Sequence, residues 1–534
     1  MSVRNALVLL LALSTLSFLA ACGGNNGTAA AVAPPSGAFG ASNLNGTYVF
    51  SVSGSDLEGG AYAMVGAFTA NGTGGISAGN VDISDLDTTE FPNGPVFDAS
   101  ISATSSYHVS VDGRGQATLN TNVTGLSVVL DFVLSTGAQG LVTEFDDVAT
   151  GSGTLDLQTA NTTPIGSYAF SLSGASGSSP SAAVGNFTLS GSSVAGFGDF
   201  NEGGLLNYPD STLSGSLILG PSQTPNTVLT LTDGGTAVLN GAFDVFAIDA
   251  THLKFIEMDG NATLSGDAYS QTSTAFPTGN LAYTLAGVSN SGDPLAAGGY
   301  MTVTSGSASI TGSEDYNLGG TITSSAIAFS ATYAVDPNDS GRYILTIPSG
   351  TFVEGTTYAA YPSSGGTLLL EVDSSGITSG AALTQTTTAF ATTAQGYGAN
   401  LSGLDFVTGS EYEVDDIAEF ATNPTGTAVT GLIDENSGTY GQLFYDQILS
   451  GNYGTIDSNG RYGISATTGN SSVGGTLEGG FNLTLYTVDG TTFPFVELDS
   501  GQTATGVILT QNASAVTPAV AHTHMFVTHP LFQA

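Results

Sequence analysis

Positively charged residues are scarce in this 534-residue chain. It has only 5 Lys and Arg against 44 Asp and Glu, which gives a formal net charge of −39. Nucleic-acid binding requires a basic surface that displaces counterions from phosphates, and five cations cannot form one. An anionic lipid surface would repel the chain for the same reason. We therefore expect no nucleic-acid partner and no electrostatic attachment to a membrane.

Cysteine and tryptophan are also rare, because the chain has one Cys and no Trp. A single thiol cannot form an internal disulfide framework. Hydrophobic residues nevertheless make up 41% of the chain, and 27 Phe and 20 Tyr supply material for buried cores, which argues against global disorder. Several domains are expected, since single cores stop growing at about 250–300 residues.

The only cysteine lies at the end of a secretory signal. Arg4 belongs to a short basic region, the apolar run 6–13 follows, and the segment closes on Leu19-Ala20-Ala21-Cys22. Such a segment is removed on secretion and is too short for a retained membrane helix. The tetrapeptide resembles the lipobox of bacterial lipoproteins, in which the signal peptidase cleaves before the cysteine and the thiol carries a diacylglycerol.

That resemblance implies a signal peptide at 1–21 and a membrane anchor through the lipid at Cys22, the first residue of the mature chain. A sorting rule of the family directs chains without Asp at the next position, here Gly23, to the outer membrane. We therefore expect a lipid-anchored protein of the cell envelope at the outer membrane, on a face that the sequence leaves open. Residues 22–40 are predicted to form a flexible tether.

Four internal repeats follow the tether. Near the end of each repeat, a Glu-x-Asp is followed by a glycine nine positions and a glutamine fourteen positions after the Glu. The four sets are Glu144, Gly153 and Gln158; Glu257, Gly266 and Gln271; Glu371, Gly380 and Gln385; and Glu497, Gly506 and Gln511. We place the repeats at 41–160, 161–274, 275–390 and 391–513, with a C-terminal tail at 514–534.

Each repeat is predicted to consist of β-strands. The opening strand alternates in character, as in Tyr48-Val49-Phe50-Ser51-Val52-Ser53-Gly54, and turn residues recur about every ten positions. About eight strands joined by short turns favour a meander, whose closure would remove free edges. We therefore predict an all-β chain of four tandem antiparallel up-and-down β-barrels, with β-sandwiches as the alternative. In plan these barrels resemble lipocalins and avidins, although without Trp the chain lacks the lipocalin Gly-x-Trp signature.

One cation remains in each repeat after the signal. The four are Arg114, Lys254, Arg342 and Arg461. Each arginine follows a glycine at an Asp-containing turn, where the second repeat is taken to have Asp233-Gly234-Gly235. We predict a structural ion pair within each repeat, between its cation and the Glu of its Glu-x-Asp: Arg114 with Glu144, Lys254 with Glu257, Arg342 with Glu371, and Arg461 with Glu497. The alternative is a guanidinium exposed to water.

Metal ions are weighed at three groups of residues. Carboxylates cluster at Asp82, Asp85 and Asp87, and at Glu411, Glu413, Asp415 and Asp416. Oxygen ligands suit calcium, but neither cluster fits an EF-hand loop, and solvated acidic loops are the favoured explanation of both. The tail histidines His522, His524 and His529 form a weak candidate set for zinc or copper. We expect no cofactor, with calcium left open.

Signatures of catalysis are almost absent. Gly75-Ile76-Ser77-Ala78-Gly79 matches Gly-x-Ser-x-Gly, but a nucleophile elbow requires a helix after the turn, and strands are predicted on both sides here. Aligning Gly79 with Gly198, Gly312 and Gly431 leaves no serine at this place in the other repeats. We therefore assign no catalytic residue and expect no enzyme.

The favoured function is that of a lipid-anchored envelope protein, a non-catalytic surface, interaction or spacer protein with an unknown protein or glycan partner. Tandem repetition supports this reading, because loops can vary for binding while the scaffold stays constant. The alternative is small-molecule or glycan binding in the barrel mouths. A hydrolase is the third reading, and it would require a polar cluster in one repeat that the others lack.

Overall fold

The computed structural model describes residues 31–515 except 87–93, 147, 205, 223, 225–226, 324, 349–354, 391–393, 408–409, 424–425, 439–441 and 470–479. Cys22 and the tail histidines His522, His524 and His529 lie outside the described residues. Within the described ranges the one helix is the short 3₁₀ turn η1 (Ala41–Asn43). No helix of that part is long and apolar enough to cross a membrane.

The prediction of four successive antiparallel β-barrels is confirmed. The second and fourth sheets are closed barrels of eight strands, and the third closes through the pairing of β19 with β20. In the first sheet the ladder is interrupted between β4 and β5. Two single bridges, Ile101 with Thr121 and Gly75 with Ser106, span that gap. The predicted barrels are therefore present rather than the alternative β-sandwiches.

Each barrel is a meander in which the last strand pairs with the first. The first barrel contains β1 (Asn45–Asp56), β2 (Ala61–Asn71), β3 (Ile76–Asp85), β4 (Val96–Ile101), β5 (Ser106–Val109), β6 (Arg114–Asn120), β7 (Ser127–Leu134), β8 (Gln139–Glu144) and β9 (Ala149–Leu157). The second contains β10 (Gly166–Ser176), β11 (Ser179–Ser190), β12 (Ser193–Glu202), β13 (Leu206–Ser216), β14 (Thr227–Asp233), β15 (Thr236–Ala247), β16 (His252–Glu257) and β17 (Thr263–Ser270).

The third and fourth barrels repeat this order. The third contains β18 (Gly279–Ser289), β19 (Pro294–Val303), β20 (Ser309–Leu318), β21 (Thr321–Ile322), β22 (Ile327–Val335), β23 (Tyr343–Thr346), β24 (Thr357–Ser363), β25 (Gly366–Glu371) and β26 (Gly376–Thr384). The fourth contains β27 (Gly396–Val407), β28 (Ser410–Thr422), β29 (Ala428–Ser437), β30 (Gln442–Tyr453), β31 (Arg461–Gly469), β32 (Phe481–Tyr486), β33 (Thr492–Glu497) and β34 (Gln502–Thr510).

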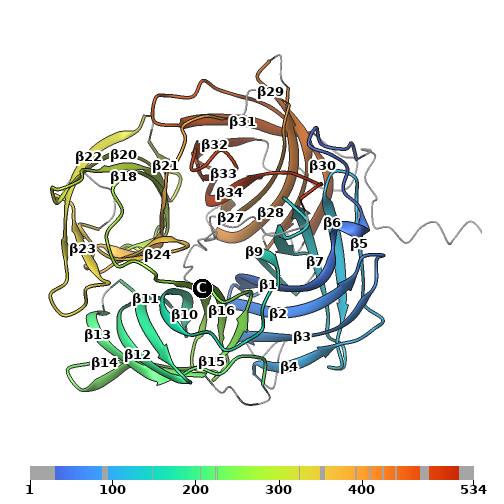
Figure 1. The fold of residues 1–534 in the computed structure, drawn as a ribbon. Coiled ribbons are helices and arrows are strands. Elements are labelled where there is room, and N and C mark those ends of the chain that lie inside the picture. The colour runs from blue at the N-terminus through green and yellow to red at the C-terminus, as the bar shows by residue number, and fades with distance from the viewer. Residues whose placement is uncertain are drawn as a thin grey trace, which may run out of the picture.

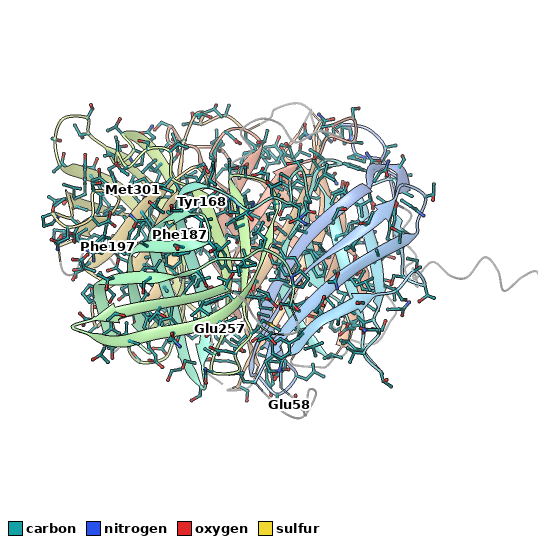
Figure 2. The ribbon with its side chains drawn as sticks, turned by 60° about the horizontal axis from the view of Figure 1, so that its bottom comes forward. Glu58, Tyr168, Phe187, Phe197, Glu257 and Met301 are labelled. Atoms are coloured by element: carbon teal, nitrogen blue, oxygen red, sulfur yellow. The ribbon has the colours of Figure 1, made fainter. Side chains whose placement is uncertain are left out.

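Every barrel is filled by its own side chains. Alternate residues of each strand point inward, as the period of a strand requires. Tyr168 stacks on Phe187 inside the second barrel with ring centroids 5.5 Å apart, and Figure 2 shows these two side chains lying close together. The first, third and fourth barrels have equivalent apolar cores. The interiors are therefore packed cores rather than channels.

The repeated glycines allow the last strand of each barrel to lie against the first. A Cβ atom at Gly153 would lie 1.7 Å from the carbonyl oxygen of Ser51, and one at Gly266 would lie 2.0 Å from that of Ser171. No side chain fits at such distances. The glycine nine positions after each Glu is therefore required by the closure of the barrel.

The repeated Glu-x-Asp also has a structural role. Its Glu ends the next-to-last strand of a barrel with its side chain inside, where Glu144 is 1% exposed and accepts from the hydroxyl of Tyr62 at 3.1 Å. Its Asp caps the following turn, as Asp146 does by accepting from the backbone N–H of Val148 at 3.0 Å. Burial, and then the charge of Asp146, raises the pKa of Glu144 well above its usual value.

The four barrels form one closed ring. In Figure 1 they follow one another around a common centre, from the blue first barrel through green and yellow to the orange fourth, which returns to contact the first. We call the four contacts joint 1–2, joint 2–3, joint 3–4 and joint 4–1. Joint 4–1 joins barrels that are far apart in the sequence, so the ring is closed without a direct covalent connection there.

Candidate functional site at the joints between barrels

Each barrel contacts the next through the same strands. The second strand of one barrel lies against the last three strands of the next: β2 against β15, β16 and β17; β11 against β24, β25 and β26; β19 against β32, β33 and β34; and β28 against β7, β8 and β9. One surface of each barrel always meets a different surface of its neighbour. Such head-to-tail contacts produce a ring when the rotation between units closes.

Apolar side chains form the centre of the joints. At joint 1–2, for example, Val65 of β2 packs with Phe246 and Ile256 of the second barrel. Equivalent positions are occupied by small residues, since Ala63, Ala182 and Ala296 lie buried at joints 1–2, 2–3 and 3–4. Small side chains at these positions allow the two sheets to approach closely.

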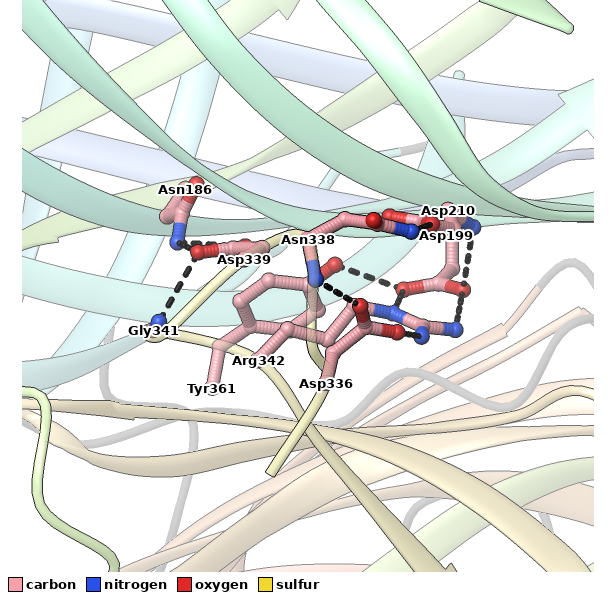
Figure 3. Close-up of polar contacts among 9 residues, drawn as sticks. All are labelled: Asn186, Asp199, Asp210, Asp336, Asn338, Asp339, Gly341, Arg342 and Tyr361. Atoms are coloured by element: carbon pink, nitrogen blue, oxygen red, sulfur yellow. Dashed lines mark hydrogen bonds and ion pairs between the residues drawn. The ribbon is translucent and has the colours of Figure 1, made fainter. Parts of the chain in front are cut away.

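Joint 2–3 contains a buried arginine that crosses from one barrel to the other (Figure 3). Asp199 on β12 accepts from Nε of Arg342 in the third barrel at 2.9 Å and also from its Nη2. The hydroxyl of Tyr361 and the backbone N–H of Asp210 donate to the same carboxylate at 2.6 and 3.1 Å. Asp336 accepts from Nη1 of the arginine. All three nitrogens of this buried guanidinium are therefore bound.

Joint 3–4 repeats this arrangement. Asp315 on β20 takes the place of Asp199, and Nε and Nη2 of Arg461 in the fourth barrel each donate to it at 2.7 Å. The hydroxyl of Tyr486 donates to Asp315 at 2.8 Å, as that of Tyr361 does to Asp199. A bidentate guanidinium–carboxylate pair fixes orientation as well as charge.

Joint 4–1 uses the same arginine position to close the ring. Nη1 of Arg114 in the first barrel donates to Asp434 on β29 at 2.9 Å, and its Nη2 lies 2.7 Å from Asp446 of the fourth barrel. Its Nε donates to Asp112 at 3.2 Å. Breaking one partner of a buried pair leaves an uncompensated charge, which costs about 3–5 kcal/mol. These arginines therefore resist separation of the barrels.

The glutamine of each repeat also crosses a joint. Its Nε2 donates to the carbonyl oxygen of the equivalent residue in the next barrel: Gln158 to Ala247 at 2.6 Å, Gln271 to Pro362 at 2.9 Å, Gln385 to Thr487 at 2.8 Å, and Gln511 to Leu134 at 3.1 Å. The glutamine of the fourth barrel thus reaches back to the first. The regular position of this residue in the sequence is explained by the ring.

An asparagine two residues after the joint aspartate completes three of the joints. Its Nδ2 donates to the backbone oxygen of the repeated Glu in the next barrel: Asn201 to Glu371 at 3.0 Å, Asn317 to Glu497 at 3.1 Å, and Asn436 to Glu144 at 2.8 Å. At joint 1–2 this position is Ser84, whose hydroxyl lies 3.5 Å from that of Thr263. Joint 1–2 therefore departs from the other three.

The predicted ion pairs within repeats were wrong in their partners. The arginines point outward to the joints, while Glu144, Glu371 and Glu497 point into the barrels, so the two groups lie on opposite faces of the sheet. Lys254 and Glu257 are three positions apart on β16 and also face opposite sides. Nζ of Lys254 lies 3.0 Å from Asp267, to which His252 is also bound. Burial would raise the pKa of Asp267, but Lys254 and then His252 lower it to about 2.

The alignment of the second repeat requires a second correction. Asp233-Gly234-Gly235 forms the turn between β14 and β15, one hairpin later than the arginine turns. The segment before β14 takes the place of those turns. Similarly, the glycine of β12 that corresponds to Gly79 is Gly196, since a Cβ atom at either would meet the backbone of the preceding strand. The sequence alignment placed Gly198 opposite Gly79, two residues too late. This error concealed the repeated Asp-x-Asn, the motif whose side chains bind across the joints.

The carboxylate clusters considered for calcium are split by the strands that carry them. Asp82 and Asp85 are three positions apart on β3 and face opposite sides, and Asp87 lies outside the described residues. Asp415 faces joint 4–1, where Thr150 donates to it at 2.9 Å, whereas Asp416 faces the barrel interior. Within the described ranges, no group of three or more His, Cys, Asp or Glu side chains is placed to hold a metal ion.

The comparisons with known proteins give no family. No protein-family model matches the chain, and no curated protein matches it in sequence. Among solved structures, transferrin binding protein B from serogroup B Neisseria meningitidis is 10% identical, covers 70% of this chain and 84% of its own, and has a TM-score of 0.20. A variant of the same protein from Haemophilus parasuis Hp5 is 9% identical, with 74% and 86% covered and a TM-score of 0.21.

Proposed function

We propose that this chain is a lipid-anchored protein of the bacterial outer membrane that acts as a rigid, non-catalytic interaction scaffold. The observation that carries the proposal is the closed ring, in which four filled barrels are held together by buried joints. A ring of this kind keeps its turns and loops in fixed relative positions, which suits presentation of a binding surface or the spacing of envelope layers. The lipobox ending at Cys22 supports the anchor.

Binding of small molecules inside the barrels receives less support. The fourth barrel contains a partly open apolar cavity of about 40 Å³ between residues such as Leu401, Phe420 and Phe495, and the third contains one of about 20 Å³. Typical ligand pockets measure about 300–1,000 Å³. The partner is therefore expected at the outer surface, and we propose a protein or a glycan for it.

The anchor is tested by metabolic labelling with an alkyne-bearing fatty acid. The unsubstituted chain should incorporate the label and fractionate with the outer membrane. Cys22→Ser removes the acceptor thiol and should abolish labelling, while Ser14→Ala in the same signal leaves it unchanged. Labelling that persists in Cys22→Ser would refute the lipid anchor.

Protease shaving of intact cells, with a periplasmic protein as control, decides the face on which the scaffold acts. Digestion of the barrels while the control survives supports a surface protein that contacts partners outside the cell. Protection until the outer membrane is permeabilised supports a periplasmic spacer or interaction role. Recovery of the unsubstituted chain in the cytoplasmic fraction would contradict both.

A further inference from the structure

Joint 1–2 differs from the other three in its charge. In joints 2–3, 3–4 and 4–1 an arginine of the following barrel lies against the joint aspartate of the preceding one. The corresponding aspartate of joint 1–2 is Asp82 on β3, which is fully buried. Its structural counterparts are Asp199, Asp315 and Asp434. The segment before β14 takes the place of the arginine turn, and its described residues include no cation.

A second carboxyl group occupies the joint instead. Asp244 on β15 is 1% exposed, and its side chain lies within hydrogen-bonding reach of that of Asp82. Asp82 accepts from the backbone N–H of Asp98 at 2.6 Å through one oxygen, and Asp244 accepts from that of Ser222 at 3.2 Å through one oxygen. The other oxygen of each carboxyl group, Oδ2 of Asp82 and Oδ1 of Asp244, has no hydrogen-bond donor among the described residues. Two acceptors can bond to each other only through a proton.

The surrounding charges do not replace the missing guanidinium. Asp98 on β4 adds a further negative charge beside the two carboxyl groups. Asp85 on β3 faces the barrel interior. Lys254 on β16 is the cation of this joint. It occupies the position that Leu368 has at joint 2–3 and Leu141 has at joint 4–1, and its ammonium group is bound to Asp267. Among the described residues, no guanidinium and no unpaired ammonium group therefore offsets the charges of Asp98 and the two carboxyl groups.

We propose that joint 1–2 is held by a proton shared between Asp82 and Asp244, in the place where the other joints have a guanidinium, and that this joint weakens as the pH rises while joints 2–3 and 3–4 do not. Arg342 and Arg461 stay charged over the whole physiological range, so joints 2–3 and 3–4 have no such dependence at this position. A neutral or alkaline medium therefore loosens the contact between the first two barrels.

The direction of the pH dependence follows from the two states of the joint. Burial, and then the charge of Asp244, raises the pKa of Asp82 to about 8, and burial raises that of Asp244 to about 6. In a loosened joint the same groups are solvated and titrate near the ordinary value, about 4. The shared proton's contribution to the stability of joint 1–2 is fully present below about pH 4. It decreases as the pH rises and is lost once the pH exceeds about 8.

The test measures the reactivity of a buried thiol at each of three joints. Ala63→Cys, Ala182→Cys and Ala296→Cys place a thiol at equivalent buried positions of joints 1–2, 2–3 and 3–4. Each is made in the full chain with Cys22→Ser, which removes the only other cysteine. Alkylation by iodoacetamide is followed from pH 5 to pH 10. Rates are compared as ratios, because the ionisation of the thiol itself accelerates all three.

The expected result is a rise in the rate at Ala63→Cys relative to the other two. A single proton limits this rise to about tenfold per pH unit, and it should level off above about pH 8. Asp82→Asn retains the bond to Asp98 and lets an amide donate to Asp244, so it should abolish the relative rise. If Asp82→Asn fails to fold, Asp244→Asn serves the same purpose. A constant ratio of the three rates, or a rise that persists in these variants, would overturn the proposal.

Discussion

Joints 4–1 and 1–2 are built from the same strands, but they are held in opposite ways. At joint 4–1 Arg114 binds two aspartates of the fourth barrel, and Gln511 donates to two backbone oxygens of the first. The barrels it joins are separated by more than 200 residues. Joint 1–2 has neither the arginine nor the asparagine, and its barrels are consecutive in the sequence.

The comparison shows where a ring of tandem domains needs its strongest contacts. Consecutive barrels are connected by a short linker, so their surfaces meet at a high effective concentration. The first and fourth barrels have no such connection, and their joint must be specified by side chains. The polar network at joint 4–1 therefore closes the ring, whereas joint 1–2 can tolerate the loss of a cation.

The largest expected effect is a pH dependence from the interior glutamates Glu144, Glu257 and Glu497 of the first, second and fourth barrels, which must be separated from that of joint 1–2. Burial raises the pKa of Glu257 inside the second barrel to about 9. A raised pKa stabilises the folded chain at low pH, and this contribution is lost as the pH rises toward the folded value. Each such group lowers the free energy of unfolding by up to about 1.4 kcal/mol per pH unit between about pH 4 and its folded pKa.

Denaturant unfolding from pH 5 to pH 9 should therefore show decreasing stability. Glu257→Gln keeps the shape of the protonated side chain and should reduce the slope while leaving stability at pH 5 nearly unchanged. Glu58→Gln on the exposed turn after β1 is the matched control and should leave the slope as it is. Stability that rises toward pH 9 would contradict this assignment of protonated interior glutamates.

Removing the arginine of joint 4–1 should have the next largest effect. Arg114→Met leaves Asp434, Asp446 and Asp112 buried without their cation, and the free energy of unfolding should fall by about 3–5 kcal/mol. Arg461→Met is the control, because the side chain of Arg461 is 28% exposed against 6% for Arg114, and it should cost less. If both variants lose the same free energy of unfolding in urea, joint 4–1 does not depend on its arginine more than joint 3–4 does.

The glutamines give a smaller contrast between joints 4–1 and 1–2. Gln511→Ala leaves the buried carbonyl oxygens of Asp112 and Leu134 without this donor and should cost about 1–3 kcal/mol. Gln158→Ala removes one bond, to Ala247, from a half-buried side chain at joint 1–2 and should cost less. Urea unfolding at pH 6 measures both. A greater loss in Gln158→Ala would reverse the proposed order of the joints.

The smallest effect tests whether joint 1–2 can be made like the others. Ser84→Asn introduces the amide that Asn201, Asn317 and Asn436 supply elsewhere, aimed at the backbone after β16. A net hydrogen bond contributes about 0.5–1.5 kcal/mol, and urea unfolding at pH 6 should show a gain of this size. Ser77→Asn, at an exposed position of the same strand, should show none. A loss in Ser84→Asn would mean that the two barrels meet differently at this joint.

The sequence was sufficient to predict the barrels, because strand closure depends on local features. Alternation of apolar residues, frequent turns and the glycines after each Glu-x-Asp all follow from how one barrel folds. Gly153 and Gly266 illustrate this, since the space they leave is occupied by the first strand of their own barrel. Such contacts recur in every repeat with the same spacing.

The joints could not be predicted from one repeat considered alone. Arg342 and Asp199 are 143 positions apart, and nothing in the spacing within a repeat indicates that they meet. The cations were recognised as unusual, but their partners were sought inside the same barrel. Correct alignment of Gly196 with Gly79 would have revealed the repeated Asp-x-Asn. Even then, the sequence pattern does not show which barrel surfaces pair with each other, and this pairing sets the order of the barrels around the ring.

The closed ring is tested most directly by the distance between the first and fourth barrels. Spin labels at Ser106→Cys and Ser450→Cys, both exposed positions, are placed in the full chain with Cys22→Ser, and the distance is measured by pulsed electron paramagnetic resonance. A closed ring predicts one narrow distance distribution, which should broaden when Arg114→Met is added. A string of independent barrels would give a broad distribution. A broad distribution in the labelled chain that retains Arg114 would therefore contradict the closed ring.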